Sequence, residues 1–255
     1  MAEPLALSVR GLRKRFGAVV ALDGVDLELR HGEVVALLGD NGAGKSTLIK
    51  CISGVHAADD GTLEIGGEPV RPRSPSDSRA LGIETVYQDL ALFDNRDPAA
   101  NFFAGREPCS PSLLGALGVV RRGRMAERTA AVLEELQVGM RSSRTPVGLM
   151  SGGQRQAIAV GRAVAFASRV VVLDEPTAAL GLRESAAVLR LIRRLPERGI
   201  GVLLVSHNLE HVMQVADRAV VLRQGVKVGE AEPSPENHEA LVSMIVGARP
   251  RGGEG

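Results

Sequence analysis

The chain has 255 residues, enough for one large domain with a substantial core, and its 31 basic and 30 acidic side chains leave a formal net charge of +1. This balance argues against a nucleic-acid partner, which a basic surface would attract. Two cysteines, Cys51 and Cys109, are too few for a disulfide framework or a cysteine zinc site, and no secretory signal opens the sequence. We therefore expect a cytoplasmic protein. Because no apolar run approaches the roughly 18 residues of a spanning helix, we expect any membrane contact to go through another chain.

The elements predicted along the chain belong to an α/β protein. The first thirty residues alternate between apolar and polar, which predicts two or three antiparallel strands. Ser74 and Pro75 are expected to be the N-cap and first residue of a helix. Helix-length segments separate several later strands, which favours a mainly parallel sheet covered by helices. Continuous apolar runs predict these strands, buried on both faces, at 33–38, 82–87, 170–173 and 201–205.

A helical insert is predicted to interrupt the order of the sheet. From 89–150 no buried-strand run occurs and helical spacing dominates, so we expect a helical subdomain there. It would separate two parts of a core, 1–88 and 151–246, within a domain that spans 5–246. The tail at 247–255 has nothing to pack and is expected to be disordered.

A phosphate loop follows the first buried strand. The string GDNGAGKS is a full match to G-x-x-x-x-G-K-[ST], between a predicted strand and a predicted helix. Its glycines let successive N–H groups converge on phosphate oxygens at the positive end of the helix. Lys45 is expected to reach the β and γ phosphates, Ser46 to ligate a bridging Mg²⁺, and Thr47 to bind the α phosphate. A glycine-rich turn with a solvated lysine, the alternative, would match by chance in about 1% of chains of this size. The predicted ATP-binding residues of this loop are Gly39, Asp40, Asn41, Gly42, Ala43, Gly44, Lys45, Ser46 and Thr47.

An acidic pair ends a later apolar strand, VVVLDE, and so reaches the sheet edge where ligands bind. Neighbouring residues of a strand point in opposite directions, so the two carboxylates have different tasks. We assign Asp174 to Mg²⁺ and Glu175 to the attacking water. Taken alone, this pair fits a helix cap after a core strand equally well.

A second anion site is predicted where the string SGGQ begins a helix. Glycines and a hydroxyl at a helix N-terminus are suited to binding a phosphate from outside. We infer that this end closes the open face of a nucleotide held by a phosphate loop, including the loop of a second chain. In isolation, a simple serine cap with glycines for close packing explains the string as well. The predicted residues are Ser151, Gly152, Gly153 and Gln154.

Taken together, GDNGAGKST, VYQD, SGGQRQ, VVVLDEPT and VSH resemble the nucleotide-binding cassette of ABC transporters in order and separation. Other phosphate-loop NTPases share the first loop and the acidic strand but lack SGGQ. The resemblance implies a RecA-like P-loop NTPase core, an N-terminal antiparallel β subdomain and an inserted α-helical subdomain. It also implies a head-to-tail dimer that encloses two ATP molecules.

The resemblance adds three site residues. It places Phe16 against the adenine ring, makes Gln88 a link between the metal and water site and the helical subdomain, and makes His207 the switch histidine near the γ phosphate. Taken alone, His207 also fits a helix-entry residue, since Ser206, His207 and Asn208 could together cap the helix that follows. The sequence departs from the family at Met150, where leucine is usual, and at Gly181, where an aspartate usually couples the two sites.

Longer strings, including VYQDLALFDN and DEPTAALG, resemble the ATPases of single-cassette importers for ribose, xylose and fructose. We predict the ATP-hydrolysing subunit of a monosaccharide importer, peripheral on the inner face of the membrane. Its expected partners are a second ATPase subunit, a separate permease and, through the permease, an extracellular sugar-binding protein. The alternatives are a soluble ABC-type ATPase of DNA repair, chromosome structure or translation, an exporter or lipoprotein-release ATPase, and a module that binds ATP without hydrolysis. Long heptads, zinc cysteines or a second cassette would favour the soluble class, and the sequence has none.

Overall fold

The structure is a computed structural model, and it describes residues 5–109, 118–135, 144–178 and 180–247. The chain divides into two compact units. We call them the core unit (Met1–Thr85, Ala167–Glu175 and Ile192–Gly255) and the helical unit (Val86–Phe166 and Pro176–Leu191).

Residues 5–30 form two long antiparallel strands, which confirms the prediction from the alternating pattern for this part of the chain. They belong to a four-stranded antiparallel sheet of order β2-β1-β4-β5. Its last two strands were not predicted, because they are short and one of them starts in a turn-like Asp-Gly pair. The strands are β1 (Leu5–Phe16), β2 (Val19–Arg30), β4 (Asp60–Ile65) and β5 (Glu68–Val70).

The second sheet has six strands in the order β10-β9-β3-β8-β7-β6. Strands β3, β8 and β7 run parallel, as predicted. Strand β9, which was not predicted, runs parallel to β3, and β10 pairs antiparallel with β9. Every residue of β3 and β8 is buried, so a continuous apolar run is what both strands require. The bounds are β3 (Val34–Leu38), β6 (Ile83–Val86), β7 (Val170–Asp174), β8 (Gly201–Val205), β9 (Arg218–Arg223) and β10 (Val226–Ala231).

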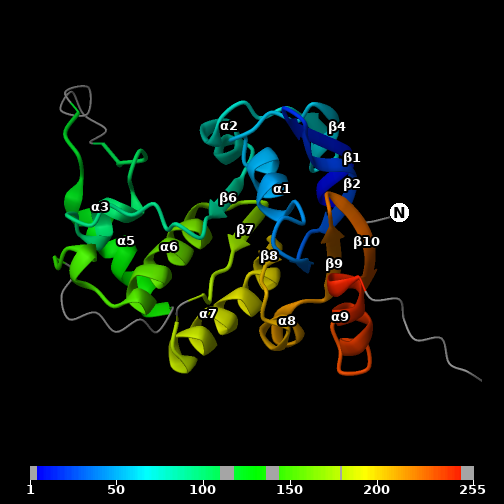
Figure 1. The fold of residues 1–255 in the computed structure, drawn as a ribbon. Coiled ribbons are helices and arrows are strands. Elements are labelled where there is room, and N and C mark those ends of the chain that lie inside the picture. Colours follow the sequence, from blue (N-terminus) through cyan, green and yellow to red (C-terminus); the bar gives the residue numbers. More distant parts are fainter. Residues whose placement is uncertain (1–4, 110–117, 136–143, 179, 248–255) are drawn as a thin grey trace, which may run out of the picture. The chain divides into compact units, whose positions relative to one another are not determined.

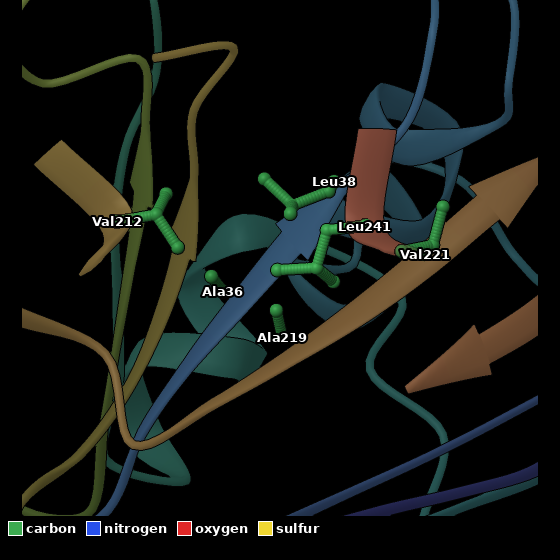
Figure 2. Packing of buried hydrophobic residues seen from close by; sticks show 6 residues of the cluster. All are labelled: Ala36, Leu38, Val212, Ala219, Val221 and Leu241. Atoms are coloured by element: carbon green, nitrogen blue, oxygen red, sulfur yellow. The ribbon is translucent and has the colours of Figure 1, made fainter. Parts of the chain in front are cut away.

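Helices of the core unit cover this sheet and close its core. Leu241 of α9 is fully buried and packs with Leu38 of β3, Val221 of β9 and Val212 of α8, as Figure 2 shows. Ser74 caps α2 by accepting a hydrogen bond from the Asp77 N–H, which confirms the predicted cap. The helices are α1 (Lys45–Ile52), α2 (Pro75–Ala80), η2 (Pro196–Arg198), α8 (Leu209–Val215) and α9 (His238–Val246), the last beside β9 and β10 (Figure 1).

The helical unit is built on contacts among α3, α5 and α6. The Phe103 and Phe166 rings meet edge to face with centroids 5.4 Å apart, and the Arg106 guanidinium lies 4.7 Å from the Phe166 ring centre. Its described elements are α3 (Pro98–Phe102), α5 (Arg122–Glu135), η1 (Val147–Leu149), α6 (Gly152–Phe166) and the start of α7 (Leu182–Arg194).

The packing of α6 bears on the predicted domain boundaries. The segment from Ser151 onward was predicted to belong to the core, whereas α6 (Gly152–Phe166) packs against α3 and α5. The division at 89–150 stays a prediction. Within the segment of predicted helical spacing, α5 is a helix as expected, whereas 136–143 lie outside the described residues, as do 248–255 of the tail. Across the residues that the structure describes, none of the helices has the length and apolar character needed to cross a membrane.

Candidate functional site

The phosphate loop connects β3 to α1, as predicted. Gly44 precedes the first helical residue with φ 104°, a left-handed conformation that glycine adopts readily. The Lys45 ammonium donates hydrogen bonds to the carbonyls of Gly39 at 2.7 Å and Asp40 at 3.0 Å. The loop therefore curls around its own lysine, and Ser46 and Thr47 follow in the first turn of α1, where N–H groups lack intrahelical acceptors.

The loop rests on the turn between β9 and β10, a feature that the sequence analysis missed. The Gly225 N–H donates to the Ala43 carbonyl at 3.0 Å, and the Gly225 carbonyl accepts from the Asp23 N–H at 2.8 Å. Gln224 and Gly225 both have positive φ. A two-residue turn ending in glycine between alternating apolar residues, here VVLRQGVKV, is the sequence signal that could have found this hairpin.

Three parallel strands bring the phosphate loop and the acidic pair to one edge of the sheet. Leu37 of β3 and Asp174 of β7 both pair with Val205 of β8, so the three residues form one row across the strands. Burial, followed by the neighbouring carboxylate of Glu175, raises the pKa of Asp174, while the Lys45 charge acts in the opposite direction. A half-buried carboxylate with a raised pKa gains from a nearby cation.

The side chains of Glu175 and His207 are in contact just beyond this row of paired residues. Glu175 Oε2 lies 2.8 Å from His207 Nδ1, and the Glu175 N–H donates to the Val205 carbonyl at 2.9 Å. Glu175 has φ 52°, which is uncommon for a residue with a side chain and is often found at functional sites. Within the segment Ser206 to Asn208, Asn208 caps α8, because its Oδ1 accepts from the His211 N–H; His207 enters the helix without supplying this cap, and its ring contacts Glu175.

The residues assigned to Mg²⁺ in the core unit have the right chemistry for it. The Ser46 hydroxyl and the Asp174 carboxylate are hard oxygen donors, which Mg²⁺ prefers. The Lys45 charge offsets only part of the effect of burial on Asp174, so the pKa of this carboxylate stays raised. These two groups therefore fit a bound divalent cation.

Phe16 ends β1, and its side chain is 43% exposed. The His56 ring meets it edge to face with centroids 5.1 Å apart, and the Lys14 ammonium lies 5.4 Å from the Phe16 ring centre. An exposed π face suits stacking on a base.

The helical unit holds the remaining predicted site residues. Ser151 and Gln154 form a capping box at the start of α6: the Ser151 hydroxyl accepts from the Gln154 N–H at 3.3 Å, and the Gln154 side chain accepts from the Ser151 N–H at 3.1 Å. The serine cap is thus present, and it leaves the N–H groups of Gly152 and Gly153 without intrahelical acceptors. Gln88 follows β6, which ends at Val86.

Close packing also explains Gly153. A Cβ at this position would lie 2.4 Å from Glu184 Cγ, so the start of α7 and the start of α6 touch. A Cβ at Gly181, where the family resemblance leads to an aspartate, would lie 2.6 Å from Glu184 Oε2. That oxygen is the far end of a flexible side chain, which could move aside, so this contact alone does not require glycine.

A glycine-rich loop between a buried parallel strand and a helix, with acidic residues at the end of a strand in the same sheet, defines a phosphate-loop NTPase. Comparison with known proteins shows to which family of phosphate-loop NTPases the chain belongs. Residues 22–178 match the ABC transporter family. The chain therefore belongs to the ABC transporter family, and it is a nucleotide-binding ATPase of that family.

Similar proteins and solved structures support the same family assignment. The chain is 44% identical to the fructose import ATP-binding protein FrcA of Rhizobium meliloti over 98% of this chain and 96% of the relative. It is 45% identical to the xylose/arabinose import ATP-binding protein XylG of Sulfolobus acidocaldarius, over 94% and 93%. The ADP conformation of MJ1267, an ATP-binding cassette of an ABC transporter, superposes with a TM-score of 0.80 at 26% identity, over 95% of this chain and 99% of that one. The RecA-like fold with helical additions is thus confirmed.

Proposed function

We propose that this chain hydrolyses ATP·Mg²⁺ at a site built around Lys45, Asp174, Glu175 and His207 to drive monosaccharide import. The observation that carries the site is the contact between Glu175 and His207, 2.8 Å apart, at the sheet edge where the phosphate loop ends. The names of the sugar-import relatives support the choice of transported solute. No single sugar is favoured among fructose, xylose, arabinose and ribose.

Each residue has a definite task in this proposal. Lys45 binds the β and γ phosphates, and the loop N–H groups bind the remaining phosphate oxygens. Ser46 and Asp174 would hold Mg²⁺, the family resemblance adds Gln88 to them, and the bound ion would neutralise charge on those phosphates. Glu175 holds the attacking water and accepts its proton. With Nδ1 protonated, His207 donates to Glu175 Oε2 and so orients that carboxylate.

The second anion site supports a dimer. Gly152 and Gly153 present N–H groups at the start of α6, and Ser151 and Gln154 hold that turn in place by their reciprocal hydrogen bonds. We infer that this turn binds the γ phosphate of ATP held by a second copy of the chain. The complex would also contain a membrane permease, which places the ATPase on the cytoplasmic face of the membrane, and an extracellular sugar-binding protein that delivers the solute.

Mixing two inactive variants tests the shared site. Lys45→Ala damages the phosphate loop and Ser151→Arg damages the turn at α6, so either homodimer has two damaged sites. In the mixed dimer, one site combines an intact loop with an intact turn, and mixing should restore part of the ATPase rate. Cross-linking must show that the mixed dimer forms. With formation shown, no recovery would reject the shared site.

Reconstitution tests the transport function. Purified chain is combined in vesicles with a permease that copurifies with it from membranes, with ATP on the side of the ATPase. Uptake of a labelled monosaccharide that stops with Glu175→Gln supports the proposal. If the chain is isolated from membranes together with ribosomes or DNA and without a permease, the result favours the soluble ABC-type ATPase instead.

A further inference from the structure

Phe16 occupies a position at which its side chain would rotate freely if no other residue held it. It ends β1 at a tight turn, in which Phe16 pairs with Val19, and its side chain is 43% exposed. A ring that rotates freely loses conformational entropy when a base stacks on it, and this loss weakens binding. Contacts that hold the ring beforehand reduce the loss.

His56 makes one of these contacts. Its half-buried ring meets the Phe16 ring at an interplanar angle of 69° with centroids 5.1 Å apart, a favourable edge-to-face arrangement. The His56 backbone is itself held, because its N–H donates to the Lys50 carbonyl in α1 at 3.0 Å. The histidine therefore links the ring to the helix that begins at the phosphate loop.

Asp59 makes three hydrogen bonds to the end of β1, the strand that carries Phe16. Its Oδ2 accepts from the Arg15 N–H at 2.7 Å, and its own N–H donates to the Arg13 carbonyl at 2.9 Å. Its Oδ1 accepts from the Lys14 ammonium at 2.7 Å, and that ammonium lies 5.4 Å from the Phe16 ring centre. The bonds from Lys14 and Arg15 hold the pKa of Asp59 below its ordinary value, so the carboxylate stays ionised at neutral pH.

We propose that His56 and Asp59 position the Phe16 ring for the nucleobase and thereby set the affinity for ATP. They are positioning residues, since they act through Phe16. The inference rests on the proposed function, in which Phe16 stacks on adenine. Because both lie in the loop after α1, they fix the base contact relative to the phosphate loop that starts that helix.

Binding measurements on the purified full chain test the proposal. His56→Ala should weaken ATP binding about three- to tenfold, the range of a lost edge-to-face pair, while kcat stays within about twofold. His56→Phe keeps a ring at the position and should restore the affinity. Binding of inorganic triphosphate, which has no base, should not change in either variant. Asp59→Asn should also weaken ATP binding, whereas Asp60→Asn is the matched control, because the Asp60 carboxylate accepts from the adjacent Gly61 N–H.

A double variant separates this proposal from the site it rests on. If His56 acts through Phe16, adding His56→Ala to Phe16→Ala should cause no further loss of ATP affinity. The proposal is overturned if His56→Ala binds ATP like the wild type, weakens triphosphate binding equally, or adds its full effect in the Phe16→Ala background. If Phe16→Ala itself leaves ATP affinity unchanged, the stacking role fails, and the positioning role fails with it. Thermal unfolding midpoints of all variants identify any that lose the fold. If His56→Ala does, His56→Gln, which removes the ring but keeps a longer polar side chain, takes its place.

Discussion

The first glycine of the phosphate loop should be far less replaceable than the second. Gly39 has φ 147°, and a Cβ there would lie 2.2 Å from the Leu222 carbonyl oxygen and 2.9 Å from Ala43 Cβ. Gly42 has φ 80°, but a Cβ there would meet no atom within 4 Å. The backbone conformation at either position would strain an alanine. Only at Gly39 would the alanine Cβ also collide with a strand, β9 of the six-stranded sheet.

These contacts set the expected magnitudes. Gly42→Ala should lower the free energy of unfolding by about 1–2 kcal/mol, the cost of a left-handed conformation with a Cβ. Gly39→Ala should lower it by about 2–6 kcal/mol, because strain and overpacking each cost about 1–3 kcal/mol. The second loss is a large part of the about 5–15 kcal/mol that keeps a typical protein folded.

Urea unfolding of the purified chain measures both losses. Nucleotide is left out, because a ligand that binds the folded state raises the apparent stability. The comparison uses midpoints with equal denaturant slopes, which show that the two variants expose the same surface on unfolding. An equal loss in both variants, or a Gly39→Ala protein as stable as the wild type, would refute the argument from the Leu222 carbonyl.

Three further predictions concern the acidic pair and the core. Glu175→Gln should retain ATP binding but lower kcat about 10²- to 10⁴-fold, as expected for a lost general base, and steady-state ATPase assays with a wild-type rate would contradict this. Asp174→Asn should raise the thermal midpoint at pH 7 while abolishing Mg²⁺-dependent hydrolysis, because burial and Glu175 raise the pKa of Asp174 and its ionised form lowers stability. Asp174→Asn should show its full gain in stability over the wild type above the folded-state pKa. The gain should disappear as the pH falls below the ordinary pKa of 3.8, because the wild-type side chain is then protonated in both the folded and the unfolded state. A gain that persists at low pH would argue against this cause. Leu241→Ala removes a fully buried side chain from the cluster in Figure 2 and should cost about 3–5 kcal/mol in urea unfolding, with ATP affinity unchanged in the protein that remains folded; a loss below about 1 kcal/mol would show that the cluster closes over the gap.

Local patterns were enough to predict the phosphate loop and its flanking elements. The loop is a run of consecutive residues, and its glycines, lysine and hydroxyls act within one turn of the chain. The same holds for the Ser74 cap and for the serine cap that the sequence offered at Ser151, where donor and acceptor are three residues apart. Interactions of this range depend on spacing alone, and spacing can be read from a sequence.

Contacts across the sheet could not be read in the same way. Glu175 and His207 come together because β7 and β8 pair in a register that sets Asp174 opposite Val205, and a shift of one residue would turn the side chains to the other face. The seat of the phosphate loop on Gly225 likewise depends on which strands become neighbours.

The sequence by itself determined the class of protein, because the chemistry of nucleotide binding requires particular residues at short, invariant spacings. Only the tertiary structure decided what holds those residues in place. Phe16 and His56 are separated by β2, β3 and α1, and their contact exists because the strands of two sheets and one helix bring their ends together. Such contacts depend on the sum of many weak packing interactions over the whole core unit, and no short stretch of sequence contains that sum.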